Sequence, residues 1–279
     1  PDLERRIHST PYADLQTQSE STLLASIDRH NLLMRETAYY NVLGPLLMGM
    51  YNNVLKSRLA KVGVDFTSFN LTEGMQEIAD FDPVTFLRRL NTDFRALTPD
   101  QQKIVRESSY AELQHNQSLG DFPKKVSDLI ARFGHLSDNG NDFSASPWRE
   151  KPDMILNLVT EFEPVKEEGQ KVSLADLRSK GQVNYPLKLF YKRAREFRLL
   201  RERISSLYTY GYGLFRYYYL ALGAHFTQNG IIDTPEDIFY LTNEQVHALV
   251  DRTTVEDFRP EIARHKADME RYQNILLPT

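Results

Sequence analysis

A stripe of polar residues runs along one predicted helix, 186–228, at steps of three or four. Its members are two arginines, a carboxylate, two hydroxyls and a phenol: Arg198, Glu202, Ser205, Thr209, Tyr212 and Arg216. Residues at this spacing share one face of an α-helix. Such a face is normally solvated, but the same groups also suit the border of a polar cavity. The pattern alone leaves both interpretations open.

A second concentration of polar groups is the loop 133–152, which reads FGHLSDNGNDFSASPWREKP and contains the only tryptophan, Trp148. Its glycines and Asn/Asp residues favour turns, and helical patterns lie on both sides, so we expect a structured loop. His135 is its only histidine. As a general base it would need Asp138 or Asp142 as a partner. The alternative is a histidine hydrogen-bonded to loop backbone.

Composition excludes several classes of chemistry. The chain has no cysteine, which removes disulfides, thiolate metal sites and cysteine nucleophiles and is compatible with the cytoplasm. Motifs for nucleotide-binding loops, the hydrolase elbow and helical zinc sites are absent from the sequence. The net charge is −4 without a dense basic block, so no nucleic-acid partner is expected. No apolar run is long enough to span a membrane, and the polar start does not resemble a signal peptide.

The elements that must position these groups are mostly helices. The segment 186–228 would form one very long helix of roughly 60 Å. Two apolar helices precede it near the start of the chain, separated by a break or kink at Gly44–Pro45. Asp82–Pro83 and Thr98–Pro99 are typical helix starts, and the second is expected to begin a helix that ends near residue 113.

Four further expectations concern local structure. Residues 1–18 are expected to be extended, and 237–241 to be short and extended. Thr242 is expected to cap a helix with Gln245 completing a capping box. Met48 and Met50 could line an adaptable pocket, although such residues more often belong to the core.

Two stretches resemble one known family. Residues 134–152 (GHLSDNGNDFSASPWREKP) resemble a segment of the middle domain of rifampicin phosphotransferases and related phosphoenolpyruvate-synthase-like proteins. Residues 193–242 (RAREFRLLRERISSLYTYGYGLFRYYYLALGAHFTQNGIIDTPEDIFYLT) resemble a later segment of the same domain. The two stretches occur in the expected order and cover about a quarter of the chain.

The resemblance implies a three-part enzyme. An ATP-grasp domain would bind ATP and Mg²⁺, and a swivelling domain would carry a phosphorylated histidine. The middle domain, to which 1–279 would correspond as a single mostly helical unit, would hold a small-molecule acceptor. This sequence contains neither the nucleotide-binding part nor the phosphohistidine motif, so no cofactor is expected in this chain and it should be inactive alone.

Within that family-derived picture, cations must hold phosphoryl oxygens, and arginine does so with two hydrogen bonds. The candidates are Arg195, Arg198, Arg201 and Arg216, and Glu202 would orient an arginine or the acceptor hydroxyl. His135, Asp138 and Asp142 would border the same site. The pocket candidates are Met48, Met50, Tyr208, Tyr212, Phe215 and Trp148.

Two other functions remain open. A helical scaffold or interaction module could keep this fold without catalysis. An independent enzyme that uses His135 with a carboxylate is disfavoured because no nucleophile or metal set accompanies it. The resemblance is compatible with an antibiotic-like molecule or a biosynthetic intermediate as the acceptor, and with transfer or ligation as the outcome.

Overall fold

The computed structural model describes residues 2–163, 171–254 and 256–272. Within these ranges the regular elements are α-helices and short 3₁₀ helices, and a single parallel bridge joins Phe69 to Val172. The predicted mostly α class is therefore confirmed. The loop 133–152 is structured by turns and one short 3₁₀ helix, as the sequence predicts.

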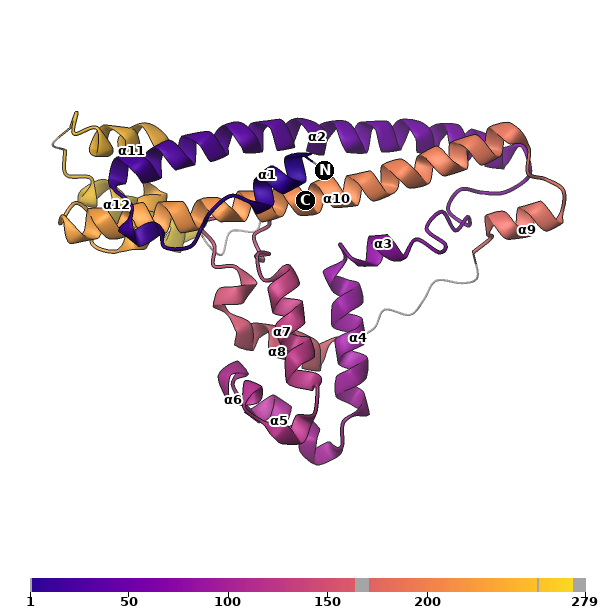
Figure 1. Cartoon of the computed structure of the whole chain (residues 1–279), viewed down its shortest axis with the longest axis horizontal. Coiled ribbons are helices and arrows are strands. Elements are labelled where there is room, and N and C mark those ends of the chain that lie inside the picture. The colour runs from indigo at the N-terminus through magenta and orange to yellow at the C-terminus, as the bar shows by residue number, and fades with distance from the viewer. Residues whose placement is uncertain (1, 164–170, 255, 273–279) are drawn as a thin grey trace. The chain divides into compact units, whose positions relative to one another are not determined.

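The chain divides into two compact units, and two long helices contribute to both (Figure 1). Unit 1 comprises Pro1–Glu36, Asn141–Ala145 and Gly211–Thr279, and unit 2 comprises Thr37–Gly140 and Ser146–Tyr210. The expectation of one domain stays a prediction, and we describe each unit separately.

The longest helix, α10, spans Tyr185–Gln228 and agrees with the predicted segment 186–228. Its apolar stripe enters the core of each unit, with Leu207 buried in unit 2 and Leu214, Tyr218 and Leu222 buried in unit 1. The neighbouring polar stripe is also covered: Arg216 is buried and the other five members are only partly exposed. The fully solvated interpretation of that stripe is therefore wrong.

The second long helix, α2, spans Glu20–Ala60 and includes Pro45, so the predicted break at Gly44–Pro45 is wrong. Pro45 removes one backbone donor, but its side chain lies on the exposed face and α2 packs against α10 on the other. In unit 2 the ring of Tyr51 stacks on Phe197 with centroids 4.8 Å apart. Gly44 is buried and lies close to α10, since a Cβ there would be in ordinary van der Waals contact, 3.9 Å from Cα of Arg201.

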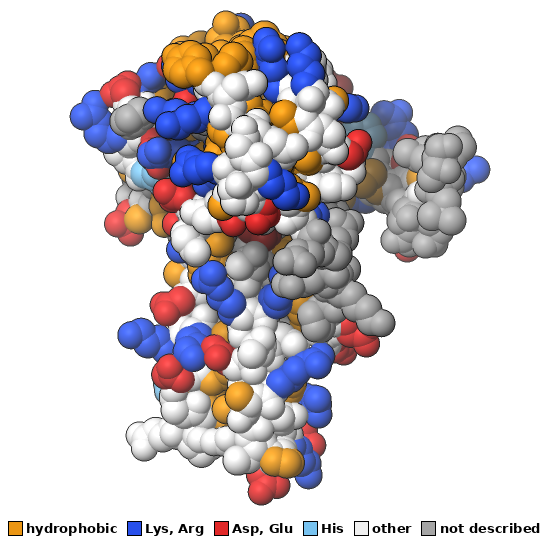
Figure 2. All heavy atoms as spheres, turned by 90° about the vertical axis from the view of Figure 1, so that its right-hand side faces the viewer, with side chains coloured by type: hydrophobic (Ala, Val, Ile, Leu, Met, Phe, Trp, Pro, Cys, Tyr) orange, Lys and Arg blue, Asp and Glu red, His pale blue; other side chains and the backbone are white. Residues whose placement is uncertain are grey.

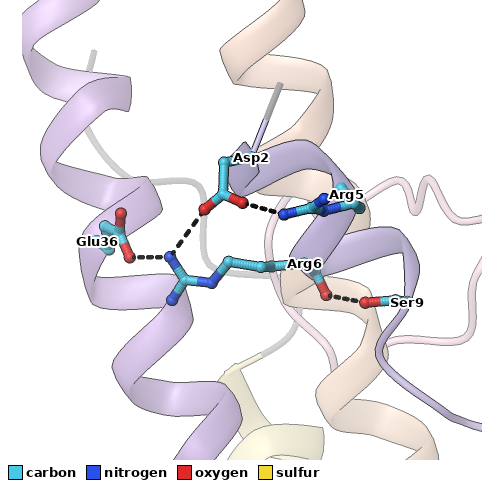
Figure 3. Close-up of polar contacts among 5 residues, drawn as sticks. All are labelled: Asp2, Arg5, Arg6, Ser9 and Glu36. Atoms are coloured by element: carbon cyan, nitrogen blue, oxygen red, sulfur yellow. Dashed lines mark hydrogen bonds and ion pairs between the residues drawn. The ribbon is translucent and has the colours of Figure 1, made fainter.

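Unit 1 begins with a helix where the sequence suggested extended chain. Helix α1 (Asp2–His8) is fixed to α2 by an ion pair of 2.8 Å between Arg6 and Glu36, and Asp2 accepts from Arg5 (Figure 3). Ile7 is fully buried. A Cβ on Gly211 of α10 would lie 2.6 Å from Sδ of Met34 and 3.3 Å from Ile7, so this glycine allows both side chains to reach α10.

The remainder of unit 1 consists of η1 (Leu15–Thr17), which precedes α2, and of the elements that follow α10. These are η4 (Pro235–Tyr240), α11 (Asn243–Val250) and α12 (Arg259–Tyr272). The predicted extended segment 237–241 is wrong, because η4 is a 3₁₀ helix that starts with a Thr234–Asp237 capping box. The predicted Thr242–Gln245 capping box is confirmed.

Unit 2 contains two apolar clusters. One is formed by the helices that follow α2: α4 (Pro83–Ala96), α5 (Pro99–Glu107), α6 (Tyr110–Gln114), α7 (Phe122–Phe133) and α8 (Pro152–Glu161). The helix predicted for 98–113 is divided, since Ser109 ends the run and caps α6. The other cluster joins α2 and α10 to α9 (Leu174–Ser179). The elements α3 (Gln76–Ala79), η2 (Gln117–Leu119) and η3 (Trp148–Glu150) complete the unit.

The part of α2 in unit 2 has an apolar exposed face. Tyr39, Val42, Leu46 and Met50 recur at steps of three and four and are each at least half exposed. Residues 37–55 contain no charged side chain. Figure 2 shows hydrophobic side chains gathered at the top of the view, where α2 lies. We refer to these four residues as the α2 stripe.

Candidate functional site

A buried arginine holds the middle of the loop 133–152. In unit 1, Arg216 Nη1 donates to the carbonyl oxygens of Ser144 (2.7 Å) and Phe143 (3.4 Å), and the side chain is 5% exposed. Its guanidinium also lies over the ring of Phe239 at 5.5 Å. Asp142 shapes the same segment by accepting from the backbone N–H and hydroxyl of Ser144. Arg216 and Asp142, both predicted near a phosphoryl group, therefore build the loop.

An aromatic cluster surrounds this segment. Tyr212, Phe215 and Tyr219 share one face of α10 because they are spaced by three and four residues. The ring of Phe143 packs on all three and stacks nearly parallel to Tyr219, with centroids 5.4 Å apart and planes 5° apart. Burial raises the pKa of the Tyr219 phenol, so it stays neutral at physiological pH. The cluster joins the loop, α10 and η4 by way of Phe239.

A cavity of about 500 Å³ lies beside this cluster in unit 1. Its walls come from the loop, from η4 with the two residues after it, and from α12. The lining residues are Ser144, Glu236, Phe239, Tyr240, Leu241, Thr242, His265, Asp268, Met269 and Tyr272. Small-molecule sites typically have 300–1,000 Å³ and mostly apolar walls with a few polar groups. The size and composition of this cavity fit that description.

An ion pair between a buried carboxylate and an exposed lysine fixes η4 against α12 next to the cavity. Lys266 Nζ lies 2.5 Å from Oδ1 of Asp237, whose side chain is 2% exposed. Burial alone would raise the pKa of Asp237, but hydrogen bonds from Lys266 and Thr234 outweigh it and lower the pKa. His265 Nδ1 contacts the Tyr240 carbonyl at 3.3 Å. These contacts hold the two walls of the cavity in place.

A separate cluster on α10 lies in unit 2. Glu202 Oε1 accepts a hydrogen bond of 2.7 Å from Arg201 and lies 3.2 Å from Nε of Arg198. The Arg198 contact is an ion pair without a hydrogen bond, because that N–H has no aligned acceptor. Glu202 is 18% exposed and both arginines just under 40%. The structure therefore brings together three predicted residues as a cluster with net positive charge.

Arg195 is not part of that cluster. Its Nη1 lies within hydrogen-bond distance of the carbonyl oxygens of Leu71 (3.0 Å) and Glu73 (2.6 Å) and of the Tyr191 hydroxyl (2.7 Å). The guanidinium thus fastens the loop after α2 to α10. Its donors are committed to protein oxygens, which makes Arg195 an architectural residue in this structure.

His135 and its predicted partners lie in different surroundings. The His135 ring meets the Tyr210 ring edge to face at 5.3 Å. Asp138 accepts a hydrogen bond from the indole N–H of Trp148 at 3.2 Å, and the backbone N–H of Trp148 donates to the Leu136 carbonyl. Asp138 is thus hydrogen-bonded to Trp148, and Asp142 is hydrogen-bonded to Ser144 in unit 1. Both carboxylates proposed as partners of the base are engaged by other groups.

The predicted pocket residues do not line the cavity described above. Phe215 and Tyr212 belong to the aromatic cluster of unit 1, whereas Met48, Tyr208 and Trp148 are partly buried in unit 2. Met50 is 50% exposed on the α2 stripe, and its pocket role stays a prediction. The sequence analysis missed the cavity residues of η4 and α12. Their available signal was the run IFYL at 238–241 followed by His265 on the last predicted helix.

Among the described residues, no group of three or more acidic or histidine side chains is arranged to hold a metal ion. In the same ranges, no helix is both long and apolar enough to cross a bilayer.

Comparisons with known proteins identify distant relatives. No family model matches the chain. An uncharacterized protein of Mycobacterium bovis and uncharacterized proteins of two strains of Mycobacterium tuberculosis are each 22% identical to it over 285 residues. The alignments cover 98% of this chain and 30% of each relative. The chain thus spans less than a third of the length of these relatives.

Proposed function

We propose that this chain is the acceptor-binding domain of an enzyme of the phosphoenolpyruvate-synthase-like and rifampicin-phosphotransferase-like kind. One observation carries the proposal. The two sequence segments that resemble that family meet in unit 1, where Arg216 and the aromatic rings join them beside one cavity. Ser144 comes from the first segment, and Phe239 to Thr242 come from the second.

The proposed reaction is phosphoryl transfer to a small molecule. A phosphohistidine on a swivelling domain, charged from ATP and Mg²⁺ on an ATP-grasp domain, would be the donor. Its N–P bond breaks, an O–P bond forms to an acceptor hydroxyl, and the hydroxyl proton is released. The catalytic contribution of this chain is positioning and charge stabilisation, which dominate phosphoryl transfer. The relatives are more than three times as long as the match, which leaves room for such domains.

Arg198 and Arg201 are the proposed phosphoryl ligands. Glu202 holds both guanidinium groups, and the two side chains keep about two-fifths of their surface accessible. Arginine binds phosphoryl oxygens through paired N–H groups, and the cluster retains one net positive charge after Glu202 is counted. Arg195 and Arg216 are left out of this role because backbone carbonyls already accept from them.

The test uses the complete natural polypeptide with ATP and Mg²⁺. Products are searched by mass spectrometry for small molecules that gain a phosphoryl group. Arg198→Ala should lower turnover at least about a hundredfold, in the range seen when one charge-stabilising group is removed. Arg193→Ala is the matched control, since Arg193 is an exposed arginine of the same helix paired with Glu196. Unchanged turnover in Arg198→Ala removes the phosphoryl role.

A non-catalytic scaffold is the second candidate, and the α2 stripe favours it. Large apolar side chains in a row on an exposed helix face are typical of interaction surfaces. Two results distinguish the functions. A scaffold would yield no ATP-dependent product from the complete polypeptide. Leu46→Glu would release the binding partner of a scaffold. We place either activity in the cytoplasm, where ATP is available.

The native size of the protein gives an independent check. Blotting and intact mass measurement in the source cells should detect a species about three times the 32.4 kDa of this chain. A native species of 32.4 kDa would require the donor domains to come from separate chains and would favour the scaffold function.

A further inference from the structure

The cavity in unit 1 has an uneven charge. Its lining includes two carboxylates, Glu236 and Asp268, and no lysine or arginine. Among the described residues, neither carboxylate has a hydrogen-bond or ion-pair partner, and both side chains are exposed. A negative lining repels anions and attracts cations.

Two of the three cations near the cavity are engaged by other protein groups. Lys266 is paired with buried Asp237 at 2.5 Å, and Arg216 donates to the loop carbonyls. Arg271 lies over the Tyr272 ring at 5.5 Å and, like the other two, is not part of the lining. Two of the three therefore have their donors committed to protein acceptors.

The remaining walls are aromatic and flexible apolar groups. Phe239, Tyr240 and Tyr272 supply rings, and Met269 supplies an adaptable thioether. Tyr272 and Met269 are more than half exposed, so this side of the cavity is accessible to solvent and to a ligand. Rings and thioethers pack well against planar aromatic molecules, and ring faces also attract organic cations.

We infer that the cavity binds a planar aromatic molecule that carries a protonated amine, and that it discriminates against aromatic carboxylates and phosphates. Applied to the acceptor, this inference rests on the proposed function. The ring would pack between η4 and α12, and the ammonium group would lie near Glu236 and Asp268. The discrimination arises from charge, because the aromatic walls accept either kind of ring equally.

The test compares two probes that share a phenol ring and an ethylene linker and carry end groups of opposite charge. Tyramine and 3-(4-hydroxyphenyl)propionate have the same phenol ring, and titration calorimetry or ligand-observed NMR on the 279-residue chain measures both. Tyramine should bind at least about tenfold more tightly at neutral pH, a difference of about 1.4 kcal/mol. Added salt should reduce the ratio, because the carboxylates are exposed.

Variants assign the preference to the cavity. Glu236→Gln with Asp268→Asn should bring the two affinities within about threefold of each other while leaving thermal unfolding unchanged. Asp251→Asn is the control, because Asp251 is an exposed carboxylate at the end of α11 and outside the lining. This variant should keep the wild-type ratio of the two affinities. Equal binding of both probes by the wild type, no tyramine binding up to millimolar concentration, or an unchanged ratio in the double variant each overturns the inference.

Binding and transfer are separated by a second assay. The complete natural polypeptide is incubated with ATP, Mg²⁺ and tyramine, and phosphorylated tyramine is sought by mass spectrometry. Charge-selective binding without any ATP-dependent product from any acceptor would sustain the cavity inference and contradict the proposed function. Phosphorylation of aromatic carboxylates in preference to amines would contradict the cavity inference and sustain the proposed function.

Discussion

Arg216→Leu should destabilise unit 1 itself, in addition to any effect on activity. Arg216 donates to the Ser144 carbonyl at 2.7 Å and contacts the Phe143 carbonyl at 3.4 Å. Leucine has a comparable apolar bulk but provides no donor. The substitution would therefore leave these carbonyls without the guanidinium and would remove its contact with the Phe239 ring.

The magnitude follows from these contacts. A hydrogen bond from a charged donor contributes about 1.5–3 kcal/mol, and the longer contact adds little. A desolvated cation–π contact contributes about 1–2 kcal/mol. Burial of leucine recovers part of this loss through its apolar surface. We expect a net decrease of about 3 kcal/mol in the free energy of unfolding.

Urea denaturation measures this change, and hydrogen exchange of residues 141–145 locates it. Arg264→Leu on α12 is the control, because Arg264 is exposed and forms no hydrogen bond or ion pair with the described residues. Arg216→Lys should give an intermediate loss, since one ammonium group cannot reproduce the guanidinium fork. A loss below about 1 kcal/mol with unchanged exchange in 141–145 would refute the reasoning. It would instead favour a phosphoryl-binding Arg216, whose removal would spare stability.

Four further substitutions test other parts of the fold. Gly223→Ala should lower the free energy of unfolding by at least about 3 kcal/mol, because its Cβ would collide with the backbone of Pro235. Gly211→Ala should lower it less, because the flexible end of Met34 can move. Thermal melts compare the two variants. Burial lowers the pKa of His30, only partly offset by its bond to the Gly211 carbonyl, so the unfolded state binds the proton first as pH falls below about 6.5. The free energy of unfolding should therefore decrease as the pH is lowered through that window. The His30→Gln variant should show a shallower dependence of this free energy on pH, and equal slopes in the two proteins would exclude His30 as the cause. Arg195→Ala should speed proteolysis at 71–73 and lower stability by about 2 kcal/mol, and a protease pattern identical to wild type would contradict the anchoring role.

The elements most fully predicted from sequence are those defined by local patterns. The helix 186–228 was predictable to within one residue because its apolar side chains keep helical spacing over its whole length. The capping box at Thr242 was equally visible, because both partners are three residues apart. Such signals depend only on neighbours in the chain.

The mispredicted elements depend on distant contacts. Pro45 suggested a break, but packing of α2 along α10 outweighs one lost backbone bond. Helix α1 is too short to be stable alone, and it forms where Ile7 reaches Gly211. Local sequence carries no information about a glycine some two hundred positions away.

The candidate site was partly predictable for the same reason. The sequence indicated that Arg198 and Glu202 share a helix face, and the structure pairs them. It also indicated a cation at Arg216, but its acceptors are carbonyls of the loop, 72 and 73 positions earlier. The cavity escaped prediction because η4 and α12 are joined by the Asp237–Lys266 pair, which no local pattern reveals.

The first apolar cluster of unit 2 has a consequence for the order of folding. All its buried members lie between Leu87 and Val159, and its Asn91–Val159 hydrogen bond closes a separation of 68 positions. The His30–Gly211 contact of α2 with α10 closes 181 positions. The longer closure costs about 0.9 kcal/mol more chain entropy, and near contacts generally form sooner. We therefore expect α4 to α8 to condense first, so that the two long helices pair after that cluster has already closed.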